Sequence, residues 1–157
     1  MHGTGEAATM GAVPAPPPPP GAQSPLERAV ARVGDRWSLL VVAALLDGPR
    51  RFGELQEAVA GIATNVLSGR LKHLEREGVV VAEAYSARPP RFSYRLTAAG
   101  RDLAGPLHLL ARWGAADADQ DGPAHAACGT ALEPIWWCPT CRRPADGPGD
   151  EGDLAYA

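Results

Sequence analysis

The sequence predicts a mainly α-helical fold of the α+β class, in which a helical domain carries one small β-hairpin and a separate small module follows. Apolar residues recur every three or four positions through residues 24–77, which is typical of amphipathic helices. Between residues 79 and 96 the pattern changes to β-branched and alternating residues, which is typical of paired strands. All three cysteines follow both patterned regions, between Cys128 and Cys141.

Composition and charge divide the chain along the same lines. The 157 residues include 18 glycines and 16 prolines, so part of the chain lacks the large apolar residues that a core requires. We expect a disordered proline-rich tail at residues 1–23, a folded domain at 24–114, an acidic linker at 115–124, a small module at 125–145 and a disordered acidic tail at 146–157. The whole chain has a net charge of -3, but its folded domain carries 13 Lys and Arg against 9 Asp and Glu. A net charge of +4 on this domain is compatible with a polyanionic partner.

Several classes of protein are excluded by features of the sequence. It holds no run of about 18 apolar residues, so no membrane span is expected. Its N-terminus lacks a basic stretch followed by an apolar one, so no secretory signal is expected. Three clustered cysteines cannot form a disulfide framework without leaving one over. These features predict a cytoplasmic protein.

Two helices are expected at the start of the folded domain. Ser24 and Glu27 form a capping box with Pro25 at the first helical position, and this helix ends near Gly34. Asp35 can cap the next helix, which ends before Gly48-Pro49. An apolar stripe with a period of 3.6 marks the inward face of the second helix: Trp37, Leu40, Val41, Ala44 and Leu45.

The next two helices are joined by a tight turn. A short helix at 52–59 places Phe52, Leu55 and Val59 on one face, and residues 60–62 form the turn. A longer helix runs from about Ala63 to Glu77, with Thr64 as the alternative N-cap and Gly78 as the C-cap. Three leucines are predicted to face inward from it: Leu67, Leu71 and Leu74.

A hairpin and a last helix complete the folded domain. Strands are predicted at 79–85 and 92–96, around a turn at Ser86–Arg91 that is rich in proline and arginine. Thr97 caps the last helix, which Pro106 bends or delays. Four apolar residues lie near one side of this helix: Leu103, Leu107, Leu110 and Trp113.

A short helix, a tight turn, a longer helix and a following hairpin match a winged helix-turn-helix. The outward face of the longer helix carries short polar groups near its N-terminus and cations further on, which suits a helix in a DNA major groove. Two arginines flank the Pro-Pro tip of the hairpin and could enter a minor groove or lie along phosphates. The competing interpretation is that this helix face is an ordinary solvent-exposed polar surface. The predicted DNA-binding residues are Thr64, Asn65, Ser68, Gly69, Lys72, His73, Arg76, Arg88 and Arg91.

The folded domain also resembles the HxlR-type winged helix-turn-helix regulators, which are relatives of the MarR family. The shared motifs are Gly34-x-x-Trp37, Gly48-Pro49-x-x-Phe52-x-x-Leu55, Gly61-Ile62, Leu67-x-x-x-Leu71-x-x-Leu74-x-x-x-Gly78 and Tyr94-x-Leu96-Thr97-x-x-Gly100. The resemblance implies a transcription regulator, with repression the more expected sign, that binds double-stranded DNA at a pseudo-palindromic operator. It also implies a homodimer formed through the first and last helices and a small-molecule inducer. Members often carry a cysteine just before the first helix, where this chain has Ser24, so thiol sensing is not implied.

The cysteine-rich module has the spacing of a zinc knuckle or ribbon. His125-x-x-Cys128 and Cys138-x-x-Cys141 form two ligand pairs separated by nine residues. Three thiolates and one imidazole would complete a tetrahedron, so we predict structural Zn2+. His108 is an alternative fourth ligand. A redox-active Cys138/Cys141 pair and unstructured thiols are the competing hypotheses.

Two other classes of function compete with DNA binding. The sequence holds no nucleophile-base motif, phosphate-binding glycine loop or paired-carboxylate motif, so we predict that the protein is not an enzyme. A zinc-containing adaptor that binds RNA or a protein of the transcription machinery is the remaining alternative. RNA recognition relies on exposed stacking aromatics, and only Trp136 and Trp137 fit that description here.

Overall fold

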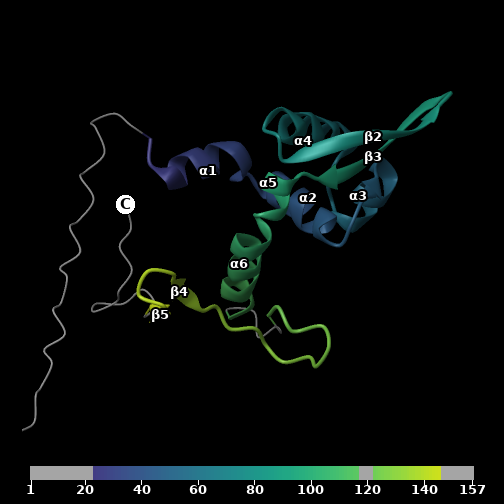
Figure 1. The fold of residues 1–157 in the computed structure, drawn as a ribbon. Coiled ribbons are helices and arrows are strands. Elements are labelled where there is room, and N and C mark those ends of the chain that lie inside the picture. The colour runs from purple at the N-terminus through teal and green to yellow at the C-terminus, as the bar shows by residue number, and fades with distance from the viewer. Residues whose placement is uncertain (1–22, 117–121, 146–157) are drawn as a thin grey trace, which may run out of the picture.

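The computed structural model describes residues 23–116 and 122–145, and both expected tails and the centre of the linker lie almost wholly outside them. Within these ranges the helices and strands follow the predicted order (Figure 1). Their bounds are α1 Pro25–Val33, α2 Arg36–Leu46, β1 Arg50–Arg51, α3 Phe52–Ala58, α4 Thr64–Arg76, β2 Val80–Ala87, β3 Pro90–Leu96, α5 Ala98–Arg101, α6 Ala104–Ala116, β4 Trp136–Cys138 and β5 Arg143–Ala145. The predicted fold class, mainly α with a small antiparallel sheet, is confirmed.

The N-caps predicted for the first two helices are present. The Ser24 hydroxyl accepts a hydrogen bond from the Glu27 amide at 3.1 Å, and the Glu27 carboxylate accepts one from the Ser24 amide at 2.7 Å. Asp35 Oδ1 accepts hydrogen bonds from the amides of Trp37 and Ser38, each at 3.1 Å. Each cap satisfies amides that the first turn of its helix leaves without a partner.

The ends of α4 differ from the prediction by about one residue. Ala63 is the N-cap, and Thr64 does not cap the helix because its hydroxyl accepts a hydrogen bond from Gln56 on α3 at 2.9 Å. At the other end Glu77 is the C-cap, and Gly78 follows it with a φ of 68°. The Val79 amide then donates to the Leu74 carbonyl, which completes a Schellman motif.

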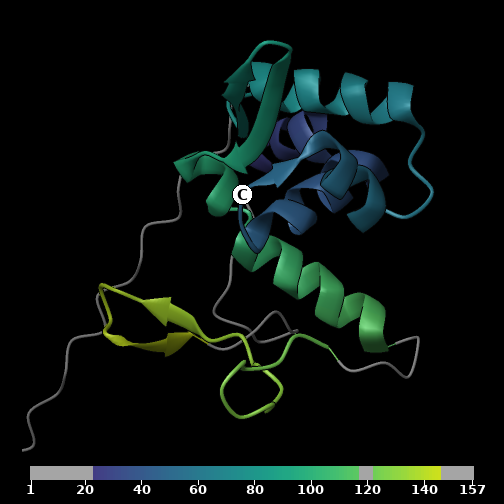
Figure 2. The same cartoon turned by 90° about the vertical axis from the view of Figure 1, so that its right-hand side faces the viewer.

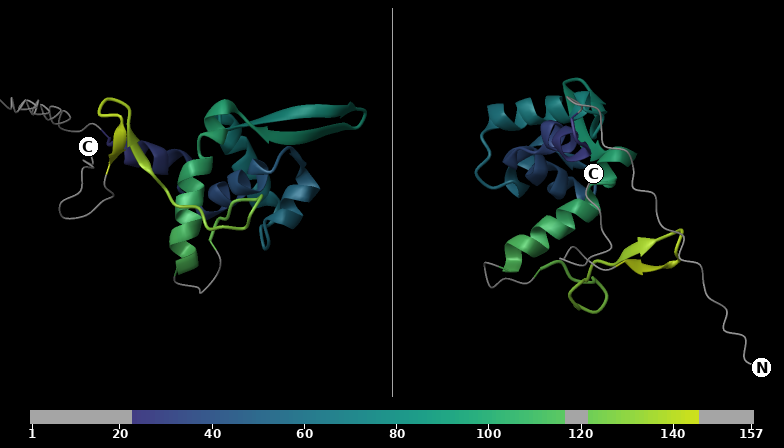
Figure 3. Two further views of the ribbon diagram at one scale, coloured as in Figure 1. Left: turned by 60° about the horizontal axis from the view of Figure 1, so that its bottom comes forward. Right: turned by 90° about the vertical axis from the view of Figure 1, so that its left-hand side faces the viewer.

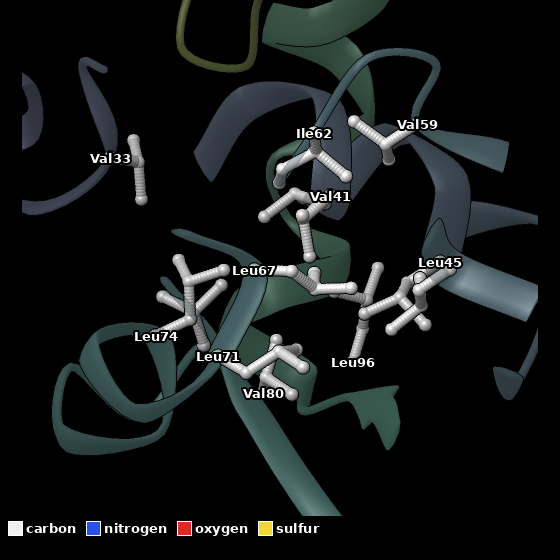
Figure 4. Packing of buried hydrophobic residues seen from close by; sticks show 13 residues of the cluster. Val33, Val41, Leu45, Val59, Ile62, Leu67, Leu71, Leu74, Val80 and Leu96 are labelled. Atoms are coloured by element: carbon white, nitrogen blue, oxygen red, sulfur yellow. The ribbon is translucent and has the colours of Figure 1, made fainter. Parts of the chain in front are cut away.

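The core lies between α2, α3, α4 and the sheet (Figure 4). Its three inward leucines from α4 are those that the sequence predicts, Leu67, Leu71 and Leu74. On α2 the prediction is wrong for Leu40, which is 42% exposed, whereas Ser38 and Val42 are fully buried. The buried hydrophobic residues are Val33, Val41, Val42, Leu45, Leu55, Val59, Ile62, Leu67, Leu71, Leu74, Val79, Val80 and Leu96.

A third strand joins the predicted hairpin. The sheet has the order β1-β3-β2, and Arg50 and Arg51 of β1 pair with Tyr94 and Ser93 of β3. The predicted six-residue turn is wrong, because β2 continues to Ala87 and β3 begins at Pro90. Proline is tolerated as the first residue of a strand, where no ladder bond is lost.

The predicted last helix is divided into α5 and α6. Thr97 caps α5 by accepting a hydrogen bond from the Gly100 amide at 3.1 Å. Pro106 is the third residue of α6. Backbone amides in the first turn of a helix have no acceptor within the helix, so the N–H that proline lacks costs no helical hydrogen bond there. Leu103 and Leu107 pack against the core, and the rest of α6 leads away from the domain (Figure 2).

Candidate nucleic-acid interface

The outward face of α4 is open to solvent. Asn65, Lys72 and Arg76 are exposed, as is Thr64 at the first helical position, while Ser68 is half-buried. A side chain added at Gly69 would meet no atom within 4 Å, and shallow hollows flank this residue on both sides of the helix. The backbone of α4 is therefore accessible to a large partner at its centre.

His73 lies at the edge of this face and contacts α1. Its ring Nε2 lies 2.8 Å from the carbonyl oxygen of Arg32 on α1, to which it can donate a hydrogen bond. The Arg32 guanidinium also forms an ion pair with Glu77 at 3.0 Å and donates to the Glu77 carbonyl. His73 is thus a contact between α1 and α4, and it also lines one of the hollows beside Gly69.

A second contact fixes α4 against α2. The Arg70 guanidinium lies 3.4 Å from the Asp35 carboxylate, the same group that caps α2. Burial raises the pKa of Asp35, but the hydrogen bonds from the backbone amides of Ser38 and Trp37 and the charge of Arg70 outweigh it and hold the pKa below its ordinary value. These contacts with α1 and α2 orient the outward face of α4.

The hairpin of β2 and β3, which we call the wing, carries the two predicted arginines at its end. Hairpin β2–β3 projects beyond the helical domain (Figure 1), with Arg88 in the turn and Arg91 on β3, both exposed. In the part of the chain that the structure describes, exposed cations therefore occur on α4 and on the wing, which follows it in the chain.

Arg51 is a further cation at this site that the sequence interpretation missed. It is exposed at the start of α3, and its guanidinium lies 4.5 Å from the centre of the Tyr85 ring on β2. A hollow between α3 and the wing is lined by both residues and by Arg91. The sequence signal that could have revealed Arg51 is the pair of adjacent arginines, Arg50 and Arg51. Unlike Arg51, Arg50 is held within the domain, because its Nε donates a hydrogen bond to the Ala44 carbonyl at 2.6 Å.

The predicted metal ligands form two pairs. His125 Nδ1 lies 3.3 Å from Cys128 Sγ, and the Cys141 amide donates to Cys138 Sγ at 3.4 Å. Hydrogen bonds from Thr130 and His125 lower the pKa of Cys128, and those from Cys141 and Thr140 lower the pKa of Cys138. Within residues 23–116 and 122–145, no three or more His, Cys, Asp or Glu side chains are gathered where they could hold one metal ion.

The helices described by the structure are also too short or too polar to cross a membrane. Their longest members, α4 and α6, have 13 residues each.

Comparisons with known proteins identify the family of this chain. A family model described as HxlR-like helix-turn-helix matches residues 32–122. The HTH-type transcriptional regulator Rv3095 of Mycobacterium tuberculosis is 37% identical over 141 residues, which cover 82% of this chain and 89% of the relative.

Solved structures show the same fold. A putative HTH-type regulator, ytcD, is 31% identical and superposes with a TM-score of 0.58 over 62% of this chain and 100% of its own. The reduced form of the redox regulator HypR is 31% identical, with a TM-score of 0.57 over 61% of this chain and 95% of its own. The chain therefore belongs to the HxlR-like helix-turn-helix family and is a DNA-binding transcription regulator, not an enzyme.

Proposed function

We propose that the protein binds a pseudo-palindromic operator as a homodimer and represses a nearby gene. In this proposal α4 enters the major groove and the wing lies on the adjacent minor groove or backbone. The observation that carries it is the open outward face of α4, polar near its N-terminus and cationic further on, with exposed cations on the wing beside it. Because the proposed partner is operator DNA, the protein would act in the cytoplasm, at the nucleoid.

The residues divide by chemistry into those suited to bases and those suited to phosphates. Thr64, Asn65 and Ser68 are short hydrogen-bonding groups near the helix N-terminus, the part of a recognition helix that contacts base edges. Gly69 lets the helix backbone approach the groove wall. The phosphate contacts are assigned to cations on three elements: Lys72, Arg76, Arg88, Arg91 and Arg51.

Exposed apolar residues on the first and last helices support the homodimer. Leu26 and Val30 on α1 are 72% and 56% exposed, and Leu110 and Trp113 on α6 are 51% and 73% exposed. Such residues at helical spacing are normally covered by another surface. A second copy is the occupant we propose, because a pseudo-palindromic operator requires two recognition helices related by twofold symmetry.

A cavity beside α6 is a candidate site for an inducer. It measures about 290 Å³ and lies between α6 and the segment Leu132–Trp136. Its lining is mainly apolar, with His108, Arg112 and Glu133 as the groups able to orient a ligand. An acidic organic molecule with an apolar body suits this lining.

Replacing Lys72 by Ala tests the DNA interface. Genomic fragments selected by binding supply the operator, and Kd is measured over a series of salt concentrations. We expect weaker binding to operator and to random DNA, and a salt slope lower by about one unit for the lost phosphate contact. Arg36→Ala is the charge-matched control, because Arg36 is an exposed arginine on α2 that belongs to neither the proposed DNA interface nor the proposed dimer surface.

Asn65→Ala tests the base contacts. It should weaken binding to the operator more than binding to random DNA, because base contacts carry sequence preference. Unchanged binding and salt slope for Lys72→Ala, or stronger binding to single-stranded RNA than to duplex DNA, would refute the interface.

A further inference from the structure

Two turns in the C-terminal region share one backbone geometry. In the first, the Gly129 amide donates to the His125 carbonyl at 2.8 Å, and Gly129 has a φ of 71°. In the second, the Arg142 amide donates to the Cys138 carbonyl at 2.8 Å, and Arg142 has a φ of 52°. Among the described residues, Arg142 is the one non-glycine residue with a positive φ. Both turns therefore place a His or Cys at their first and fourth positions and a left-handed residue at the fifth.

Each turn closes a short antiparallel pair of segments. The His125 amide donates to the Thr130 carbonyl at 2.8 Å, and Ala124 bridges to Ala131. The second turn joins β4 to β5, with Cys138 opposite Arg143. The region thus consists of two similar hairpins, joined by residues 132–135.

The first and fourth residues of each turn contact each other, through both side chains in the first turn and through a backbone amide in the second. A nitrogen at about 2.0–2.1 Å and a sulfur at about 2.3 Å from one tetrahedral zinc ion are separated by about 3.6 Å. His125 Nδ1 and Cys128 Sγ lie 3.3 Å apart, close to this separation. In the second turn the Cys141 amide donates a hydrogen bond to Cys138 Sγ at 3.4 Å, which fixes that sulfur on the inner side of the turn.

This region lacks an apolar core of its own. Ile135 is 74% exposed, and Leu132, Trp136 and Trp137 are also exposed. A segment of about 20 residues without buried apolar area needs another source of stability, such as a metal or disulfides.

We propose that His125, Cys128, Cys138 and Cys141 bind one Zn2+ and that the metal draws the two hairpins together. The two pairs do not form one group among the described residues, and Figures 2 and 3 show the loop before residue 132 and the β4–β5 hairpin at separate places. Binding would therefore bend the connection 132–135, which also lines the cavity beside α6, and fold the module around the ion. Such coupling of metal binding to folding is usual in small zinc modules. Three thiolates and one imidazole leave no open position for a substrate, so the ion is structural.

The test uses the full chain, stripped of metal by a chelator under reducing conditions and titrated with Co2+. We expect one Co2+ per chain, with the visible absorption of a tetrahedral site and thiolate-to-cobalt charge transfer, and its displacement by Zn2+. Metal should protect amides of residues 124–145 from hydrogen exchange, while the far-UV signal of the helices stays unchanged. Weak six-coordinate binding without charge transfer would overturn the proposal, as would loss of the helical signal on chelation.

Single variants separate one four-ligand site from its alternatives. Cys128→Ser and Cys138→Ser should each abolish the tetrahedral spectrum, because the ligands come from both hairpins. A Cys128→Ser chain that still binds one ion per two chains would instead show a site made by Cys138 and Cys141 of two copies. His125→Asn should weaken binding, and His108→Asn, the matched histidine on α6, should leave it unchanged. The reverse result for the two histidines would overturn the assignment of the fourth ligand.

Discussion

The helical domain and the C-terminal hairpins of this regulator are stabilised in different ways. The domain buries 13 hydrophobic residues between its helices and sheet, and α4 alone contributes three leucines. The hairpins leave their large apolar residues exposed, and their described contacts are backbone hydrogen bonds and polar contacts around His125 and the cysteines. The outward face of α4 thus rests on a core formed by the chain itself, whereas the described residues of the hairpins have no such core.

The largest effect is expected from removing a core leucine. Leu71→Ala leaves a cavity beneath the outward face of α4 and should lower the free energy of unfolding by about 2–5 kcal/mol. Chemical denaturation followed by far-UV circular dichroism measures it. Leu132→Ala is the matched change in the hairpins, where the leucine is exposed, and it should leave the unfolding of the helical domain unchanged. Equal destabilisation by the two variants would show that hairpins and domain form one cooperative unit.

A smaller effect is expected at the cap that joins α2 to α4. Asp35→Ala removes the hydrogen bonds to Trp37 and Ser38 and the ion pair with Arg70, and should cost about 1 kcal/mol. Asn can still cap the helix, so Asp35→Asn isolates the contribution of the charge.

The pH dependence of stability has a definite sign at this cap. The pKa of Asp35 is lower in the folded state than its ordinary value, so its charge stabilises the fold fully above that ordinary value, near pH 4. This contribution is lost as the pH falls through the lowered pKa of the folded state. The difference in unfolding free energy between the wild type and Asp35→Asn should therefore shrink below about pH 4. A difference that stays constant from pH 6 to the acid transition would contradict the charge contribution.

The smallest effect is expected at the buried hydroxyl of Ser38, for which the half-buried Thr97 is the comparison. Ser38 Oγ is fully buried and has no hydrogen-bond partner among the described residues, so Ser38→Ala should change stability little or raise it by up to about 1 kcal/mol. Thr97 Oγ1 donates to the Gly78 carbonyl and accepts from the Gly100 amide, so Thr97→Ala should lower stability by about 1 kcal/mol. Thermal unfolding measures the change in stability of each variant relative to the wild type. A loss of similar size at Ser38 would show that its hydroxyl has a partner in solution.

The side of α4 that faces solvent could be predicted because its determinants are local. The leucine spacing of α4 fixes which side is buried, and therefore places Asn65, Lys72 and Arg76 on the opposite side. The exception is His73, at the edge of that face, because a neighbouring helix supplies the carbonyl that it contacts. Arg51 was missed for the same reason, since its place beside the wing depends on the pairing of β1 with β3.

The sequence by itself determined the caps at Ser24, Asp35 and Thr97, the inward leucines of α4, the order of elements and the spacing of the His and Cys pairs. Each of these depends on residues within about one or two helical turns, where hydrogen bonding and periodicity decide the outcome. Only the tertiary structure decided the third strand, the short turn of the wing, the division of the last helix and the contacts that orient α4. Those features join segments distant in sequence, and the contacts that stabilise them exist only once the core has brought the segments together.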